Sequence, residues 1–144
     1  MLRVDFRLKD QIISSSPEET MQIGAKIGTV LNPGAIVALK GGLGSGKTIL
    51  AQGIAQSLGI KEQITSPTYT IISEYEGSIP FYHMDVYRLC GDEDFHLSGG
   101  EELLYGKGIC VIEWAERITL PSGTLYISII ILEDGKRCIS WEKP

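Results

Sequence analysis

A glycine-rich segment of eight residues follows the pattern of a phosphate-binding loop, G-x-x-x-x-G-K-[ST], as Gly41-Gly42-Leu43-Gly44-Ser45-Gly46-Lys47-Thr48. Its glycines let the backbone curl around phosphate oxygens without Cβ clashes, so that successive N–H groups point inward. Lys47 is expected to reach the β- and γ-phosphates of a nucleoside triphosphate, and the Thr48 hydroxyl to bind Mg²⁺. The predicted phosphate-binding residues are Gly41, Leu43, Gly44, Ser45, Gly46, Lys47 and Thr48.

The flanking elements suit such a loop. Residues 35–39 form a continuous apolar run, as in a strand buried on both faces, and residues 48–58 are predicted to form a helix that ends at Gly59. The partial positive charge at the start of that helix favours an anion. This context argues against a mere glycine-rich turn with a solvated lysine.

Phosphoryl transfer also needs carboxylates. Glu113 directly follows the apolar strand predicted over residues 109–112, where an acid is costly unless it meets a cation. We therefore predict that Glu113 shares Mg²⁺ with Thr48, rather than lying at the surface. Asp85 closes the apolar segment 81–84, and the pattern leaves open whether it meets the nucleotide or caps the chain. Ser66-Pro67-Thr68-Tyr69 is compatible with a switch loop that senses the γ-phosphate, although by itself it favours an ordinary turn.

The remaining elements complete an α/β pattern. Ser16-Pro17-Glu18-Glu19 predicts a helix start. Strands are predicted over residues 1–7, 68–75, 79–86 and 108–112, a short helix over 101–105, and a hairpin from 124–132 and 137–141 around a turn at 133–136. We expect one domain over residues 1–144, with a mixed sheet, a parallel core, antiparallel C-terminal strands and helices on both faces, as in P-loop NTPases.

Composition narrows the function. The net charge of −5 argues against blanket attraction to nucleic acid. No apolar run approaches the roughly 20 residues that span a bilayer, and the N-terminus lacks the apolar core of a signal peptide, so a cytoplasmic protein is expected. The three cysteines lack zinc-ligand spacing and are expected to be reduced thiols; they are Cys90, Cys110 and Cys138.

In order and spacing, these segments resemble the TsaE family (also called YjeE), bacterial ATPases of tRNA threonylcarbamoyladenosine biosynthesis. The resemblance covers nearly the whole chain, and the segments downstream of the phosphate loop are far more specific than the loop itself. The matching segments are Glu19-Thr20 with Gly24, the loop at 41–48, Ser66-Pro67-Thr68-Tyr69-Thr70, His83-Met84-Asp85-Val86-Tyr87-Arg88 and Val111-Ile112-Glu113-Trp114-Ala115-Glu116-Arg117.

The resemblance implies an ATPase whose hydrolysis supports the TsaB–TsaD complex, which moves a threonylcarbamoyl group onto adenosine next to the tRNA anticodon. It implies that Thr48 and Glu113 are the Mg²⁺ ligands and that Lys47 is the phosphate lysine. Asp85 would orient or deprotonate water, and Trp114 would shape the site. Contact with tRNA is expected to be indirect.

Two positions depart from the family. Gly42 stands where members commonly have aspartate, which removes a negative charge near the phosphates. Gly135-Lys136-Arg137 stands where the family often has Gly-Arg. The resemblance implies base contacts from the start of the N-terminal helix and from this turn, but it assigns them to no single residue.

Two other functions fit a phosphate loop. A small-molecule kinase usually needs a lid with several arginines, whereas only five arginines occur here, dispersed along the chain. A binding module would use nucleotide without useful catalysis. No arginine finger is evident, Arg88 being the nearest candidate, so we expect slow turnover that a partner accelerates.

Overall fold

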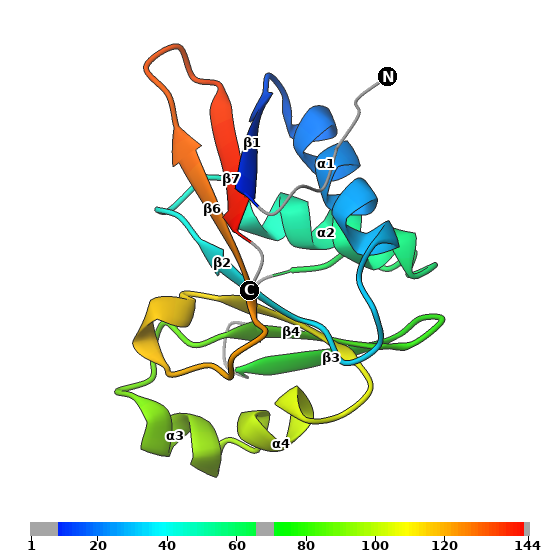
Figure 1. Ribbon diagram of the computed structural model, residues 1–144, viewed down its shortest axis with the longest axis vertical. Helices are drawn as coiled ribbons and strands as arrows, with labels where there is room; N and C mark the ends of the chain where they lie inside the picture. The colour runs from blue at the N-terminus through cyan, green and yellow to red at the C-terminus, as the bar shows by residue number, and fades with distance from the viewer. Residues whose placement is uncertain (1–8, 66–70, 143–144) are drawn as a thin grey trace.

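A seven-stranded sheet in the order β1-β7-β6-β2-β5-β4-β3 runs through the described residues (Figure 1). The computed structural model describes residues 9–65 and 71–142. The strands are β1 (Lys9–Ser14), β2 (Ile36–Lys40), β3 (Ile72–Glu76), β4 (Pro80–Asp85), β5 (Ile109–Glu113), β6 (Leu125–Ile131) and β7 (Arg137–Glu142). The helices are α1 (Pro17–Thr29), α2 (Lys47–Ser57), α3 (Asp92–Leu97) and α4 (Gly100–Leu104), with a short 3₁₀ helix, η1 (Ala115–Arg117).

The centre of the sheet is parallel. β2 pairs with both β5 and β6, and β4 pairs with β5, all in parallel. Antiparallel strands flank this core, with β7 and β1 on one side and β3 on the other. The mixed sheet with a parallel core and antiparallel C-terminal strands is thus confirmed. Because parallel strands end at the same edge, the register sets Leu39 and Asp85 beside Glu113.

Helices cover both faces of the sheet, as predicted. α1 and α2 pack together on one face, while α3, α4 and η1 lie on the other (Figure 1). The first face buries Ile23, Leu50 and Ile127, and the second buries Phe95, Leu104 and Ile112. Within the described residues, no helix has the length and apolar content to cross a membrane.

The start of α1 follows its sequence signature. The Ser16 side chain accepts a hydrogen bond of 3.1 Å from the Glu19 N–H, and the Glu19 carboxylate accepts one of 2.7 Å from the Ser15 N–H. Each side chain thereby satisfies a backbone donor that the helix leaves free.

The first strand of the described chain, β1, lies at Lys9–Ser14, and no strand was predicted there. The strand expected at residues 1–7 and the segment 66–70 both lie outside the described residues. α3 was missed as well, since six residues with three acids in the first turn show too little apolar periodicity.

The contact between α1 and α2 depends on glycine. A Cβ at Gly53 would collide with the Met21 carbonyl oxygen, and one at Gly24 with the Leu50 carbonyl oxygen. Gly53→Ala is therefore expected to lower the free energy of unfolding by about 1–3 kcal/mol, although alanine usually stabilises a helix. Chemical denaturation measures this, with exposed Gln56→Ala in the same helix as control. A Gly53→Ala protein as stable as wild type would show that the helices can separate without cost.

Candidate functional site

The phosphate loop connects the carboxyl end of β2 to the first residue of α2. Gly44 and Gly46 have φ values of 73° and 109°, a region that residues with side chains rarely adopt. Gly46 caps α2 without a side-chain hydrogen bond, so no side chain competes for the N–H groups at the helix start. The loop has the backbone form that an anion site requires.

Lys47 folds back across this loop. Its Nζ donates a 2.6 Å hydrogen bond to the Gly41 carbonyl and lies 3.8 Å from the centroid of the Trp114 ring. The side chain is buried, and this burial lowers the pKa of Lys47, against the opposing effect of the carboxylates of Glu113, Glu116 and Asp85. The chain thus keeps a partly desolvated cation inside the loop.

Trp114 has a strained backbone. Its φ of 61° is the one positive φ at a non-glycine position in the described parts of the chain. This conformation directly follows β5 and presents the indole ring to the ammonium group, a cation–π contact. The ring also packs against Tyr87, with centroids 4.8 Å apart. Trp114 was expected to shape the site, and the structure shows one contact through which it can do so, the contact of its ring with the Lys47 ammonium group.

Thr48 and Glu113 meet although they come from separate segments. The Thr48 Oγ1 donates a 3.3 Å hydrogen bond to Glu113 Oε2. Glu113 is buried at the carboxyl end of β5, and Thr48 lies in the first turn of α2. The two expected metal ligands are therefore adjacent.

His83 is a site residue to which the sequence reasoning gave no role. Its Nε2 lies 2.5 Å from Glu113 Oε2, and the ring is completely buried. Nδ1 has no hydrogen-bond partner. The tautomer with hydrogen on Nε2 donates to the carboxylate and leaves a lone pair, rather than an unpaired N–H, in the core. His83 therefore fixes the orientation of the Glu113 side chain. Its position two residues before Asp85, on the same strand face, is the available sequence signal.

Asp85 ends β4 and pairs with Glu113 in the parallel register. Its Oδ1 accepts a 3.0 Å hydrogen bond from the Tyr87 N–H. The capping role is therefore present in the structure, while the carboxylate also acts on Lys47 through its charge. The other role left open by the sequence, contact with the nucleotide, stays a prediction.

The donor atoms suit Mg²⁺. Hydroxyl and carboxylate oxygens are hard ligands, and Mg²⁺ is commonly held by one or two carboxylates together with substrate phosphates. Among the described residues, no group of three or more His, Cys, Asp or Glu side chains could hold a metal ion by itself. Thr48 and Glu113 supply one hydroxyl and one carboxylate oxygen, a pair of donors that fits Mg²⁺ once other ligands complete its shell.

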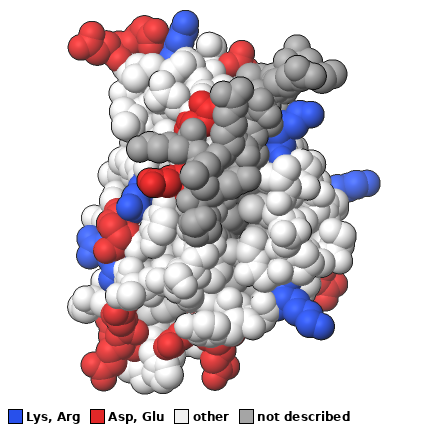
Figure 2. Space-filling view, in the orientation of Figure 1, with Lys and Arg blue, Asp and Glu red and all other residues white. Residues whose placement is uncertain are grey.

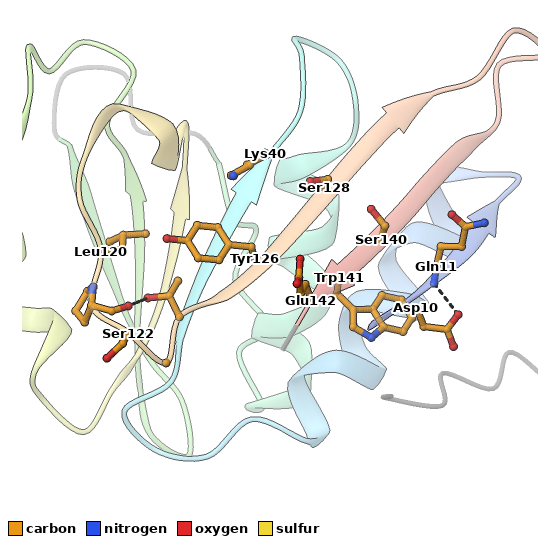
Figure 3. Close-up of a pocket in the computed structure, with 13 residues that line it drawn as sticks. Asp10, Gln11, Lys40, Leu120, Ser122, Tyr126, Ser128, Ser140, Trp141 and Glu142 are labelled. Atoms are coloured by element: carbon orange, nitrogen blue, oxygen red, sulfur yellow. Dashed lines mark hydrogen bonds between the residues drawn. The ribbon is translucent and has the colours of Figure 1, made fainter. Parts of the chain in front are cut away.

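A pocket of 1120 Å³ lies on the sheet face that carries Lys40, Tyr126 and Ser128 (Figure 3). Lys40 stands 4.7 Å over the Tyr126 ring there, although the next residue, Gly41, begins the phosphate loop. The pocket is lined by none of the predicted site residues. The residues described above lie instead at the carboxyl edge of β2, β4 and β5, where α/β sheets commonly bind ligands.

Comparisons with known proteins agree with this arrangement. The family described as "Threonylcarbamoyl adenosine biosynthesis protein TsaE" matches residues 14–139. A protein of Treponema pallidum named tRNA threonylcarbamoyladenosine biosynthesis protein TsaE is 47% identical over 130 residues, covering 89% of this chain and 96% of the relative. Its namesake in Bacillus subtilis is 43% identical over 129 residues, covering 88% of this chain and 80% of the relative. The crystal structure of Bacillus subtilis YdiB matches with a TM-score of 0.78 and 36% identity, over 92% of this chain and 84% of that one.

Proposed function

This chain belongs to the TsaE family of threonylcarbamoyl adenosine biosynthesis proteins, and we propose that it binds ATP with Mg²⁺ and hydrolyses the ATP. We further propose that hydrolysis supports the modification of tRNA by a complex of the TsaB–TsaD type. The relatives' names place them in the biosynthesis of threonylcarbamoyladenosine in tRNA.

The observation that carries this proposal is the meeting of Thr48 and Glu113, whose side-chain oxygens are 3.3 Å apart at the mouth of the phosphate loop. A hydroxyl and a carboxylate beside a glycine loop and a buried lysine are the parts that phosphoryl transfer uses.

Each residue has a task in binding. The backbone N–H groups of the loop and of the first turn of α2 surround the phosphate oxygens. Lys47 would turn its ammonium group from the Gly41 carbonyl to the β- and γ-phosphates, with the Trp114 ring forming one wall beside that group. Thr48 and Glu113 would hold Mg²⁺, which when bound neutralises charge on the phosphates. His83 holds the Glu113 carboxylate in the required orientation.

Asp85 is proposed to orient the attacking water or to accept its proton. It lies beside Glu113 at the same sheet edge, and as the last residue of β4 its backbone is fixed by the pairing with β5. A carboxylate in this place could serve a water molecule in line with the γ-phosphate.

The charge distribution favours indirect contact with tRNA. Acidic side chains gather over α3 and α4, at the lower end of the molecule in Figure 2. They are Asp92, Glu93, Asp94, Glu101 and Glu102. Such a surface repels phosphates. A protein complex is therefore the better candidate for the direct partner.

Two variants of Asp85 test the catalytic part of the proposal. Asp85→Asn keeps an oxygen that can accept the Tyr87 N–H, but it cannot accept a proton. Hydrolysis is expected to fall by about a hundredfold in both Asp85→Asn and Asp85→Ala, while ATP affinity stays near that of wild type. Phosphate release, measured with and without the partner complex, and calorimetric binding of ATP provide the two readouts.

Asp94→Asn is the matched control, because Asp94 also accepts a backbone N–H, that of Cys90, and the substitution removes the same charge. If Asp85→Asn hydrolysed ATP at the wild-type rate, Asp85 would be a cap alone. If the phosphoryl group were transferred to a metabolite and not to water, the protein would be a kinase and the proposed hydrolysis would be wrong.

A further inference from the structure

The phosphate loop is held from outside by an arginine on another part of the chain. At the start of β7, the Arg137 Nε donates a 3.1 Å hydrogen bond to the Ser45 carbonyl, and Nη2 donates one of 3.2 Å to the Gly44 carbonyl. Nη1 donates to the Gly135 carbonyl in its own turn. In the described chain, no carboxylate forms an ion pair with this guanidinium. The hydrogen bonds that its guanidinium donates in the described chain all go to backbone carbonyl oxygens.

The support behind Arg137 is rigid. Its backbone is paired with Ile131 of β6 on one side and with Ser14 of β1 on the other. The turn before it is closed by hydrogen bonds of 2.8 Å from the Leu132 N–H to the Lys136 carbonyl and of 2.9 Å from the Gly135 N–H to the Leu132 carbonyl. A planar guanidinium on such a base has two donors at fixed separation, which an ammonium group lacks.

The geometry fixes two peptide units. In a trans peptide the C=O and the N–H point in opposite directions. Carbonyls of Gly44 and Ser45 that accept from Arg137 therefore turn the N–H groups of Ser45 and Gly46 away from it, and the Ser45 N–H donates a 3.3 Å hydrogen bond to the Gly42 carbonyl within the loop. A loop with glycines at 44 and 46 would otherwise have many conformations, and ordering them on binding would cost affinity.

We propose that Arg137 is a positioning residue that holds the phosphate loop in its binding form before nucleotide arrives. This inference rests on the proposed function, since it assumes that the loop binds nucleotide. The turn at 135–137 would then support the phosphate loop, a role different from the contact with the base that the family resemblance implies.

The test compares Arg137→Gln and Arg137→Lys with Lys136→Gln. Lys136 is the adjacent cation, with its Nζ 4.0 Å from Asp134, so Lys136→Gln removes the same charge without touching the loop. The affinity for ATP is expected to fall about tenfold in both Arg137 variants and to change little in Lys136→Gln. At saturating ATP, the rate of hydrolysis stays near that of wild type.

Amide hydrogen exchange supplies the second readout. In nucleotide-free protein, residues 41–48 are expected to exchange faster in Arg137→Gln than in wild type, and saturating ATP removes most of this difference. Weaker binding with unchanged exchange would overturn the proposal, because Arg137 would then contact the nucleotide itself. Equal weakening in Lys136→Gln would overturn it in favour of a simple charge effect. If the wild-type protein failed to bind ATP, the proposed function would be wrong. The exchange rates of the nucleotide-free proteins would still show whether Arg137 orders the loop.

Discussion

Replacing Lys47 with alanine is expected to reduce ATP hydrolysis by at least about a hundredfold. The ammonium group lies inside the loop, 2.6 Å from the Gly41 carbonyl, where a polyphosphate would offer it a charged partner instead. No other lysine or arginine makes a described contact within this loop's interior, since Arg137 contacts the outer carbonyls. Phosphate release under saturating ATP measures the loss, and calorimetry measures the accompanying fall in affinity.

The fold itself gains little from this charge. Burial lowers the pKa of Lys47, so the ammonium form is less favourable in the folded protein than in the unfolded chain. That cost is present in full below the lowered pKa, and it shrinks as pH rises from the lowered pKa to the ordinary lysine value of 10.5. A lysine kept at such a cost points to function. Lys47→Ala should therefore lose activity while its thermal unfolding stays close to that of wild type.

Lys40→Ala is the matched control for Lys47→Ala. Lys40 is seven positions earlier, and its side chain lies over Tyr126, in the pocket that none of the predicted site residues lines. Both substitutions remove one positive charge and a long side chain. Undiminished hydrolysis by Lys47→Ala, or an equal loss in both proteins, would refute the assignment of the phosphate lysine.

The sequence was sufficient to predict the loop and the meeting of Thr48 with Glu113. The reason is topological: continuous apolar runs indicate parallel strands, and the ends of neighbouring parallel strands lie at one edge. The loop that begins at Gly41, two residues after the end of the first run, and Glu113, directly after the second run, are then brought to the same edge of the sheet.

The supporting residues could not be predicted in this way. His83 contacts Glu113 from the neighbouring strand, and Arg137 contacts the loop from a hairpin more than ninety residues away in the chain. Such contacts depend on register and side-chain direction, which leave no local pattern. The strained backbone of Trp114 is likewise invisible in the sequence, because its φ of 61° is imposed by the surrounding structure.

Glu113→Gln is expected to remove most of the Mg²⁺ dependence of nucleotide binding. The variant keeps nearly the same shape, and its amide oxygen can still accept from His83, so the packing around the buried side chain is retained. The negative charge that a divalent cation requires is lost. We expect the apparent affinity for Mg²⁺ in the presence of ATP to fall at least about tenfold, with hydrolysis falling further. Titration of Mg²⁺ into the ATP-bound protein measures the affinity directly.

Glu116→Gln separates the metal role from the general effect of charge. The carboxylates of Glu113 and Glu116 both act on Lys47, and each substitution removes one negative charge. Glu116, however, is exposed in η1, whereas Glu113 is the residue that meets Thr48. If charge near Lys47 were the whole effect, the two variants would behave alike, and the assignment of Glu113 as a metal ligand would be wrong. If Glu113 holds the ion with Thr48, Glu116→Gln keeps the Mg²⁺ affinity of wild type, and Thr48→Val shares the defect of Glu113→Gln.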